Sequence, residues 1–436
     1  MITGIPAVAF GAALLLLFML LGMPVFIAFM LVNLIALLLL IGPTSFGMLA
    51  SSIFETTTSG SLVTIPLFIL MGEILFRSNA VDVLFRSMDD LIGHIRGRQY
   101  TLSIALATIF STLSGAAMGV AAMLGRSLLP GMVARGYDPK LSVGNILAGA
   151  SLAPLVPPSV LVIIIGTLAS VSIAGLLVAG IIPGLMFAAL FLLYTFIRIR
   201  LNPKLAPESE SIERTVSGGE KLMAVIRMLP FTIIIISVMG FILMGIATPS
   251  EAGATGVVGA LIAAAIYRRL SFKMVVESVG SAAMISTMIF IIMASSKLFS
   301  QLLAFTGGAS ALTAWVVAME FAPWIMLIIL MLLPFILCMF IDQIALMLII
   351  IPIYKPIIEV LGFDPMWFWL IFLVNITVGG MTPPFGYTLF ALKSAWTEGT
   401  LMQVYGAAWP FVLLFLLGMV ILGFFPALVT YLPSLL

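Results

Sequence analysis

Charged residues are scarce in this sequence. Asp, Glu, Lys and Arg make up 8% of the 436 residues, whereas 63% are apolar, and an ordinary soluble domain has about a quarter of its residues charged. The 19 basic and 17 acidic side chains are scattered along the chain and leave a net charge of +2, so nucleic acid is excluded as a partner. This composition predicts a polytopic integral membrane protein surrounded by membrane lipid.

Cysteine and histidine are almost missing. The single cysteine, Cys338, and the single histidine exclude a disulfide framework, a thiolate metal cluster and a histidine-rich zinc site. A glycine-rich loop ending in Gly-Lys-Ser/Thr is also lacking, which excludes direct use of ATP. We therefore expect no organic cofactor and no enzyme. The alternative, a membrane-embedded enzyme, would need a catalytic partner for Asp342.

Long apolar runs are abundant instead. Residues 5–41 would reach ~55 Å as one helix at ~1.5 Å per residue, well beyond the ~30 Å hydrocarbon core of a bilayer. A glycine and a proline in the middle of the run split it in two. The first predicted elements are spans at 5–21, 24–41 and 60–77 and a charged surface helix at 80–95.

Two further apolar segments of the first half are interrupted in the middle. Small polar residues around Ser114 predict a re-entrant hairpin over 99–135. Pro157-Pro158 predict a broken span over 140–168, because a continuous helix does not tolerate two prolines there.

The second half repeats the first at a constant offset. Gly136-Tyr137-Asp138-Pro139 recurs as Gly362-Phe363-Asp364-Pro365, and Pro157-Pro158 recurs as Pro383-Pro384 at the same offset. The predicted organisation is a first repeat at 1–200, a cytoplasmic linker at 201–227 and a second repeat at 228–436, with its hairpin at 322–361 and its broken span at 365–395. Each repeat makes an odd number of crossings, so the second is expected to be inverted relative to the first.

The positive charges predict the orientation. With the linker in the cytoplasm, 16 of the 19 Lys and Arg residues fall on the cytoplasmic side, and the outer segments 42–59 and 304–321 contain none. This distribution obeys the positive-inside rule. Both termini are therefore predicted to lie outside the cytoplasm.

The motifs of both halves carry a family resemblance. They are Ser114-Gly115, Pro130, Gly136-Tyr137-Asp138 and Pro157-Pro158-Ser159 in the first half, and Thr248-Pro249-Ser250-Glu251-Ala252, Phe340-Ile341-Asp342, Asn375 and Gly379-Gly380-Met381-Thr382-Pro383-Pro384-Phe385-Gly386 in the second. Together they resemble the large membrane (M) subunit, DctM-like, of tripartite ATP-independent periplasmic (TRAP) transporters. The resemblance covers essentially the whole chain.

The resemblance implies an all-α polytopic membrane protein with an inverted-topology repeat, two re-entrant hairpins and two broken helices, working as an elevator-type transporter. It implies import of an organic anion, a carboxylate, with sodium ions as coupling ions. A periplasmic substrate-binding protein (P) and a small four-helix membrane subunit (Q) would be its partners, in the bacterial inner membrane. A stand-alone divalent-anion and sodium symporter of the same architecture is the alternative. We expect the hairpins, the broken spans and the third span of each half to move together against a frame of the other helices.

The broken spans and the hairpin tips are the predicted binding sites. A break in mid-membrane frees carbonyls at one helix end and presents positive dipole at the next. Sodium ligands are expected at Ser111, Ser114, Asn145, Ser151, Ala153 and Val156 in the first half and at Asp342, Asn375, Thr377, Gly379 and Thr382 in the second. Substrate-binding residues are expected at Ser114, Gly115, Ala116, Arg126, Ser159, Asp342 and Pro384.

Each charged residue deep in the chain has a second interpretation. Asp342 is equally well explained as a helix cap that accepts backbone N–H groups. Arg126 and Lys297 are typical of snorkelling or ion-paired side chains. Glu73 lies four residues before Arg77, the spacing of a surface ion pair on a helix.

Overall fold

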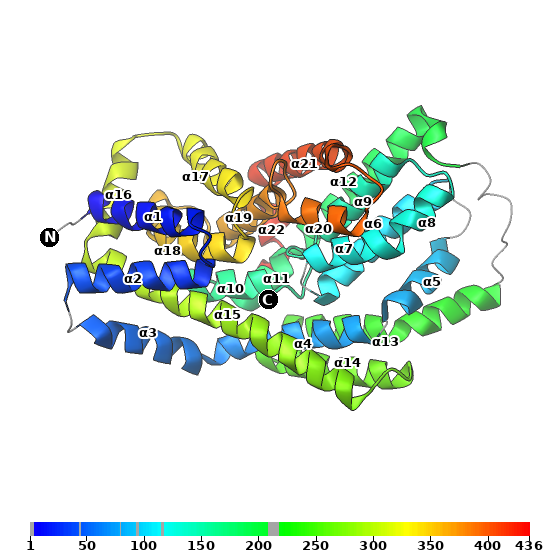
Figure 1. Ribbon diagram of the computed structural model, residues 1–436, viewed down its shortest axis with the longest axis horizontal. Helices are drawn as coiled ribbons and strands as arrows, with labels where there is room; N and C mark the ends of the chain where they lie inside the picture. The colour runs from blue at the N-terminus through cyan, green and yellow to red at the C-terminus, as the bar shows by residue number, and fades with distance from the viewer. Residues whose placement is uncertain (1–3, 43–44, 79, 93–95, 115–116, 208–217) are drawn as a thin grey trace.

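Helices make up nearly all of the computed structural model, which describes residues 4–42, 45–78, 80–92, 96–114, 117–207 and 218–436 (Figure 1). No residue within these ranges lies in a β-strand. Eight helical stretches of the described chain are long and apolar enough to cross a membrane. The all-α polytopic membrane fold that the family resemblance implies is confirmed.

The first half contains α1 (Ile5–Leu20), α2 (Val25–Leu40), α3 (Phe46–Thr58), α4 (Thr64–Arg77), α5 (Ala80–Ile92), α6 (Arg98–Ser114), α7 (Ala117–Ser127), α8 (Leu129–Ala134), α9 (Pro139–Ala150), α10 (Val160–Ala169), α11 (Ile173–Ala179) and α12 (Ile181–Leu201). The second half contains α13 (Gly218–Leu243), α14 (Pro249–Ile266), α15 (Phe272–Phe305), α16 (Gly308–Ala318), α17 (Pro323–Cys338), α18 (Gln343–Leu361), α19 (Pro365–Gly379), α20 (Tyr387–Ala395), α21 (Leu401–Phe424) and the short α22 (Ala427–Thr430).

Helices of the two halves begin at matching positions. The pairs α3 and α15, α7 and α18, and α9 and α19 are each separated by one common offset between their first residues. It is the offset that separates the Gly-aromatic-Asp-Pro motifs and the double prolines in the sequence. The helix α3 is a difference from the prediction, which placed residues 42–59 in an outer segment without naming a helix there.

The Gly-aromatic-Asp-Pro motif forms the same local structure in both halves. Gly136 and Gly362 have φ of +85° and +69°, a left-handed conformation that favours glycine and ends the preceding helix. Asp138 then accepts a hydrogen bond from the backbone N–H of Leu141 at 2.7 Å, and Asp364 does the same for Trp367 at 2.8 Å. Each motif is therefore a sharp chain reversal followed by a capped helix start.

Both predicted breaks are present in the helices that follow. In the first, α9 ends at Ala150 and α10 begins at Val160. In the second, α19 ends at Gly379 and α20 begins at Tyr387. The double prolines lie within these breaks, and the peptide bond inside each pair is cis.

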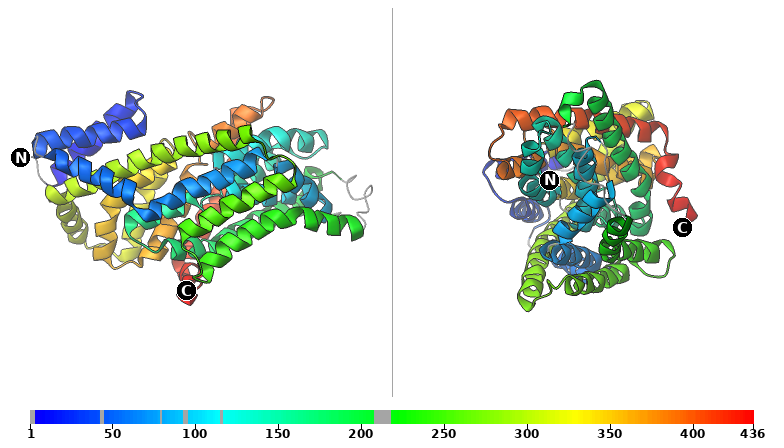
Figure 2. Two further views of the ribbon diagram at one scale, coloured as in Figure 1. Left: turned by 90° about the horizontal axis from the view of Figure 1, so that it is seen from below. Right: turned by 90° about the vertical axis from the view of Figure 1, so that its right-hand side faces the viewer.

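Long helices of both halves pack side by side along one face of the molecule, and we call α2, α4, α13, α14 and α15 the frame helices (Figures 1 and 2). Polar contacts join them. The Asn33 Nδ2 of α2 donates to the Ser295 carbonyl of α15 at 2.7 Å, and the Thr64 hydroxyl of α4 donates to the Ser250 hydroxyl of α14 at 3.1 Å. The third spans, α4 and α15, thus pack chiefly against each other and against α2 and α14. The sequence-based prediction placed them with the hairpins instead.

The half-helices form the other part of the molecule, and we call α6 to α10 and α17 to α20 the inner helices (Figure 1). At their centre is α19, whose residues from Trp367 to Gly379 are all buried. The helix contacts α10, α11, α17, α18 and α21, and is apolar on every side for that reason.

Candidate functional site

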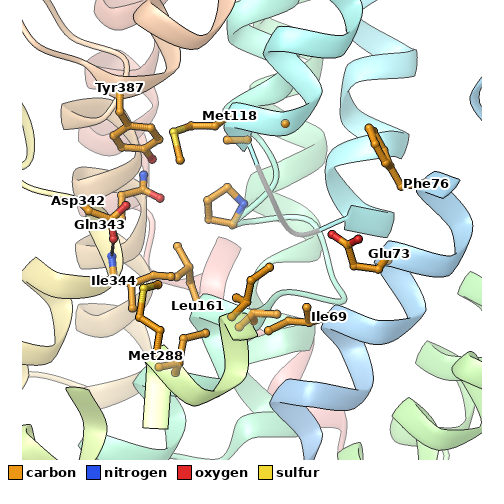
Figure 3. Close-up of a pocket in the computed structure, with 17 residues that line it drawn as sticks. Ile69, Glu73, Phe76, Met118, Leu161, Met288, Asp342, Gln343, Ile344 and Tyr387 are labelled. Atoms are coloured by element: carbon orange, nitrogen blue, oxygen red, sulfur yellow. Dashed lines mark hydrogen bonds between the residues drawn. The ribbon is translucent and has the colours of Figure 1, made fainter. Parts of the chain in front are cut away.

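A cavity of about 370 Å³ lies between the inner helices and the frame helices (Figure 3). Its walls come from α4 and α15 and from the first residues of four half-helices. Asp342, Gln343 and Tyr387 lie on one side of it, and Glu73 and Phe76 lie on the opposite side (Figure 3). We call this volume the central cavity.

The central cavity receives helix N-termini from both repeats. It is lined by the first three residues of α7, the first two of α10 and of α18, and the first residue of α20. Helix N-termini carry partial positive charge and unpaired N–H groups, and therefore favour an anion. These four N-termini converge beside two carboxylates that line the same cavity, those of Asp342 and Glu73.

Apolar side chains cover most of the remaining wall. Ile69 and Phe76 come from α4, and Ile285, Met288 and Ile289 come from α15. A mostly apolar wall with a few convergent polar groups is typical of a site for a small organic molecule.

Asp342 fits both of its interpretations. Its Oδ1 accepts hydrogen bonds from the backbone N–H groups of Ile344 at 2.9 Å and of Ala345 at 3.4 Å, so it caps α18. The same side chain lines the central cavity. It therefore brings an acidic oxygen next to four helix N-termini, where a cation and an anion could be held together.

Two predicted sodium ligands of the first half differ in their hydrogen bonds. They are Asn145, within α9, and Ser151, which directly follows α9. Asn145 accepts a hydrogen bond from the Thr195 hydroxyl at 2.7 Å and donates to the Leu141 carbonyl at 3.0 Å. The Ser151 hydroxyl is buried and has no hydrogen-bond partner among the described residues. Ser151 is thus the better candidate of the two for holding an ion.

Two carbonyls of the first break, those of Ala153 and Pro154, have lost their usual donors. In a continuous helix the carbonyl of Ala153 would accept from residue 157, but Pro157 has no N–H. Val156 precedes the two prolines, and Ser159 caps α10 by accepting from the Val162 N–H at 3.5 Å. The local sequence therefore leaves oxygen atoms of this break open to other partners.

The predicted ligands of the second half are partly engaged within the protein. The hydroxyls of Thr377 and Thr382 donate to the carbonyls of Leu373 and Val378, each four residues earlier. The Gly379 carbonyl accepts from the Thr382 N–H at 3.1 Å.

Asn375 joins α19 to the second hairpin. Its Nδ2 donates to the Met331 carbonyl of α17 at 2.7 Å. The residue lines an apolar groove of about 500 Å³ between α17, α19 and α21. This groove shares no lining residue with the central cavity.

Three other predicted substrate contacts, Arg126, Ser159 and Pro384, do not line the central cavity. Arg126 is exposed in the last turn of α7, at the opposite end of that helix from the cavity. The Pro384 carbonyl accepts from the Tyr405 hydroxyl. Gly115 and Ala116 lie outside the described residues, as do the side chains of Ser111 and Ser114.

Several residues that line the cavity are not among the predicted site residues. Gln343 lines the cavity and donates from Nε2 to the Ile376 carbonyl at 3.1 Å, and Tyr387 begins α20 three residues after Pro384. Both residues could have been predicted from the sequence, because Gln343 follows Asp342 and Tyr387 lies close to Pro384. Glu73 forms the expected ion pair with Arg77 at 3.1 Å and also lines the cavity.

The fold and the cavity define a polytopic α-helical membrane protein whose broken helices meet at one central site. The family model of the tripartite ATP-independent periplasmic transporter, DctM component, matches residues 12–428. The chain belongs to this family. It is a large permease subunit of a TRAP transporter and a multi-pass protein of the bacterial inner membrane.

Curated relatives match along most of their length. The C4-dicarboxylate TRAP transporter large permease protein DctM of Pseudomonas aeruginosa is 28% identical, over 91% of this chain and 92% of the relative. The ectoine TRAP transporter large permease protein TeaC of Halomonas elongata is 31% identical, over 86% of each chain. Among solved structures, the YdaH transporter of Alcanivorax borkumensis has a TM-score of 0.63 at 17% identity and 88% coverage of both chains, which shows a shared fold.

Proposed function

We propose that this subunit imports an organic acid as its carboxylate, together with sodium ions, by an elevator motion. The observation that carries the proposal is the central cavity, where four helix N-termini and Asp342 meet. The relatives are named for C4-dicarboxylate, ectoine and 2,3-diketo-L-gulonate. All three compounds bear a carboxylate, the group that these helix N-termini favour.

Sodium ions would bind beside the substrate in the two breaks. Sodium prefers oxygen ligands, and broken membrane helices supply them as backbone carbonyls. Two features support a site in the first half: the carbonyls near Ala153, and the hydroxyl of Ser151, which has no partner in the described part of the chain. Asp342 would supply negative charge that attracts the cation and so stabilises the anionic substrate next to it.

The elevator motion would carry the inner helices past the frame helices. The central cavity lies between these two groups, since its walls come from the half-helices on one side and from α4 and α15 on the other. The inverted repeat would supply the second state, open to the other side of the membrane, by exchanging the roles of its halves. The substrate would arrive on a periplasmic binding protein, and the small four-helix subunit would hold the frame in place.

The test is uptake into proteoliposomes that contain this chain and its small membrane subunit, with the binding protein loaded with succinate. Uptake is expected only with an inward sodium gradient. Full uptake with a proton gradient and no sodium would contradict sodium coupling. Uptake at the same rate without the binding protein would favour the stand-alone symporter.

A pair of variants links coupling to the cavity. Asp342→Asn keeps an oxygen that can cap α18 but removes the charge, so we expect a higher sodium concentration for half-maximal uptake. Asp364→Asn is the matched control, because Asp364 caps α19 and lies outside the cavity lining. Equal sodium dependence in both variants would remove Asp342 from the sodium site.

A further inference from the structure

A second hollow in the molecule is unusually polar. Its volume is about 560 Å³, and it is lined by Lys297 and by five hydroxyl-bearing residues, Ser59, Ser61, Thr167, Ser170 and Ser172. We call it the hydroxyl recess. These side chains gather five hydroxyls and one amine around a single hollow. Such a cluster is notable because only 8% of the chain is charged.

Lys297 is held there by an exchangeable partner. Its amine forms an ion pair with the Glu55 carboxylate of α3, and the two side chains remain 41% and 46% exposed. Ion pairs that water reaches in this way are weak, because solvent and salt screen them. A carboxylate arriving from solution can therefore replace Glu55 at little free-energy cost.

A second amine lies at the edge of the recess. Lys355 of α18 donates from Nζ to the Ser170 hydroxyl at 2.9 Å. Ser59 and Ser61 lie only 3.0 Å apart, between their hydroxyl oxygens. The Thr167 hydroxyl already donates to the Ile163 carbonyl at 2.8 Å. The recess thus offers two cationic groups and the hydroxyls of four serines, which is the chemistry that binds a carboxylate.

The recess and the central cavity lie at opposite ends of one helix, α10. The helix α10 begins at the central cavity, which Val160 lines, and its end at Gly166 and Thr167 lines the recess. Ten residues of α-helix are ~15 Å long, so the two hollows are about one short helix apart. Ser59 and Ser61 precede α4 and Lys297 belongs to α15, so the recess joins the frame helices to the inner helices.

We propose that the hydroxyl recess is a second carboxylate site, which holds the substrate before it enters the central cavity. Lys297 is its cationic anchor, and Glu55 occupies that anchor until substrate replaces it. The inference rests on the proposed function for the identity of the ligand as a carboxylate.

The experiment measures how carboxylates raise the melting temperature of the purified chain in complex with its small subunit. Potassium succinate and potassium acetate are the probes, with potassium chloride as the control for ionic strength. We expect Lys297→Gln to weaken carboxylate binding roughly tenfold, since it removes a charge-assisted hydrogen bond. Glu55→Gln should strengthen binding about two- to fivefold, because it removes the competing carboxylate.

Opposite shifts in these two variants are the signature of competition. A purely structural ion pair would give shifts of the same sign, and that result would overturn the proposal. Lys297→Arg should restore binding if Lys297→Gln folds poorly. Lys273→Gln is the matched control, because Lys273 pairs with Glu277 at 3.9 Å at the other end of α15 and should leave binding unchanged.

The outcome is separable from the proposed function. Equal carboxylate response in the wild type, Lys297→Gln and Glu55→Gln would place all binding elsewhere and overturn the recess site, even if sodium-driven uptake is intact. The absence of any carboxylate effect on the wild type would overturn it as well. Opposite shifts with no sodium-driven uptake would support the recess and contradict the coupling mechanism instead.

Discussion

Ser151 illustrates how one side chain can report a binding site. The residue is 1% exposed and its hydroxyl has no partner among the described residues, and an unpaired buried hydroxyl costs about 1–3 kcal/mol. Ser142, on the preceding helix α9, is also fully buried, but it donates to the Asp138 carbonyl at 2.8 Å. The two serines therefore differ in bonding far more than in burial.

We expect their alanine variants to separate stability from sodium binding. Ser151→Ala should raise the sodium concentration for half-maximal uptake roughly tenfold, because it removes an ion ligand. Ser142→Ala should lower the free energy of unfolding by about 1 kcal/mol through the lost hydrogen bond, with unchanged sodium dependence. Sodium titrations of uptake and thermal unfolding measure both effects. An unchanged titration for Ser151→Ala would take that residue out of the ion site.

At the scale of single elements, close helix contacts decide where the breaks lie in space. Gly379 ends α19 against α17. A Cβ added there would come within 2.7 Å of the Cys338 Cβ and 2.9 Å of the Phe335 carbonyl oxygen. That contact sets the second break directly beside the second hairpin. Only a residue without a side chain allows the two backbones to approach so closely.

Gly379→Ala should therefore force α17 and α19 apart. We expect a loss of about 1–3 kcal/mol in the free energy of unfolding, the usual effect of overpacking, and slower uptake. Gly240→Ala in α13 is the control, since a Cβ there meets nothing within 4 Å and alanine favours a helix by up to ~1 kcal/mol. Thermal unfolding compares the two. A melting temperature for Gly379→Ala at or above that of Gly240→Ala would show that the contact yields without strain.

Elements whose boundaries depend on a few neighbouring residues can be predicted from the sequence. A double proline removes backbone donors wherever it occurs, so the breaks at Pro157 and Pro383 are readable without knowledge of the fold. The end of α3 is different, because its threonines are typical of a loop. In the structure Thr56 and Thr58 donate to carbonyls four residues earlier and stay helical.

The composition of the cavity could not be predicted in the same way. Glu73, Met288 and Tyr387 are far apart in the sequence and meet only because the frame helices and the inner helices pack together. No periodicity within one segment encodes such a meeting. Asp342 was predictable, because an acidic residue in an apolar run is rare and therefore functional or capping, and it lines the cavity as well as capping α18.

At the scale of the whole molecule, the two ends of α15 allow the predicted orientation to be tested by chemical labelling. Its 34 residues span ~50 Å, more than the ~30 Å hydrocarbon core, so its ends should reach opposite sides of the membrane. Lys273 near its start and Ser310 just beyond its end are both exposed.

We expect Ser310→Cys to react with an impermeant thiol reagent from outside intact cells. Lys273→Cys should react only after the cells are made permeable. The native Cys338 is buried and provides a low background. Labelling of Lys273→Cys from outside would reverse the predicted orientation, including the periplasmic position of both termini.

The division into frame helices and inner helices makes the strongest prediction for the whole molecule. Ser61, just before α4, and Thr167, in α10, face the same recess from opposite sides of that division. Thr64 and Ser250 are in contact at 3.1 Å within the frame. A bifunctional thiol reagent that joins cysteines at 61 and 167 should stop uptake, because it ties a moving helix to a static one, while sodium still binds. The same link between cysteines at 64 and 250 should leave uptake intact, because both helices belong to the frame.

If the link between 61 and 167 left the rate unchanged, the inner helices would not slide past the frame. Gating around a fixed site would then be the better account of the broken helices.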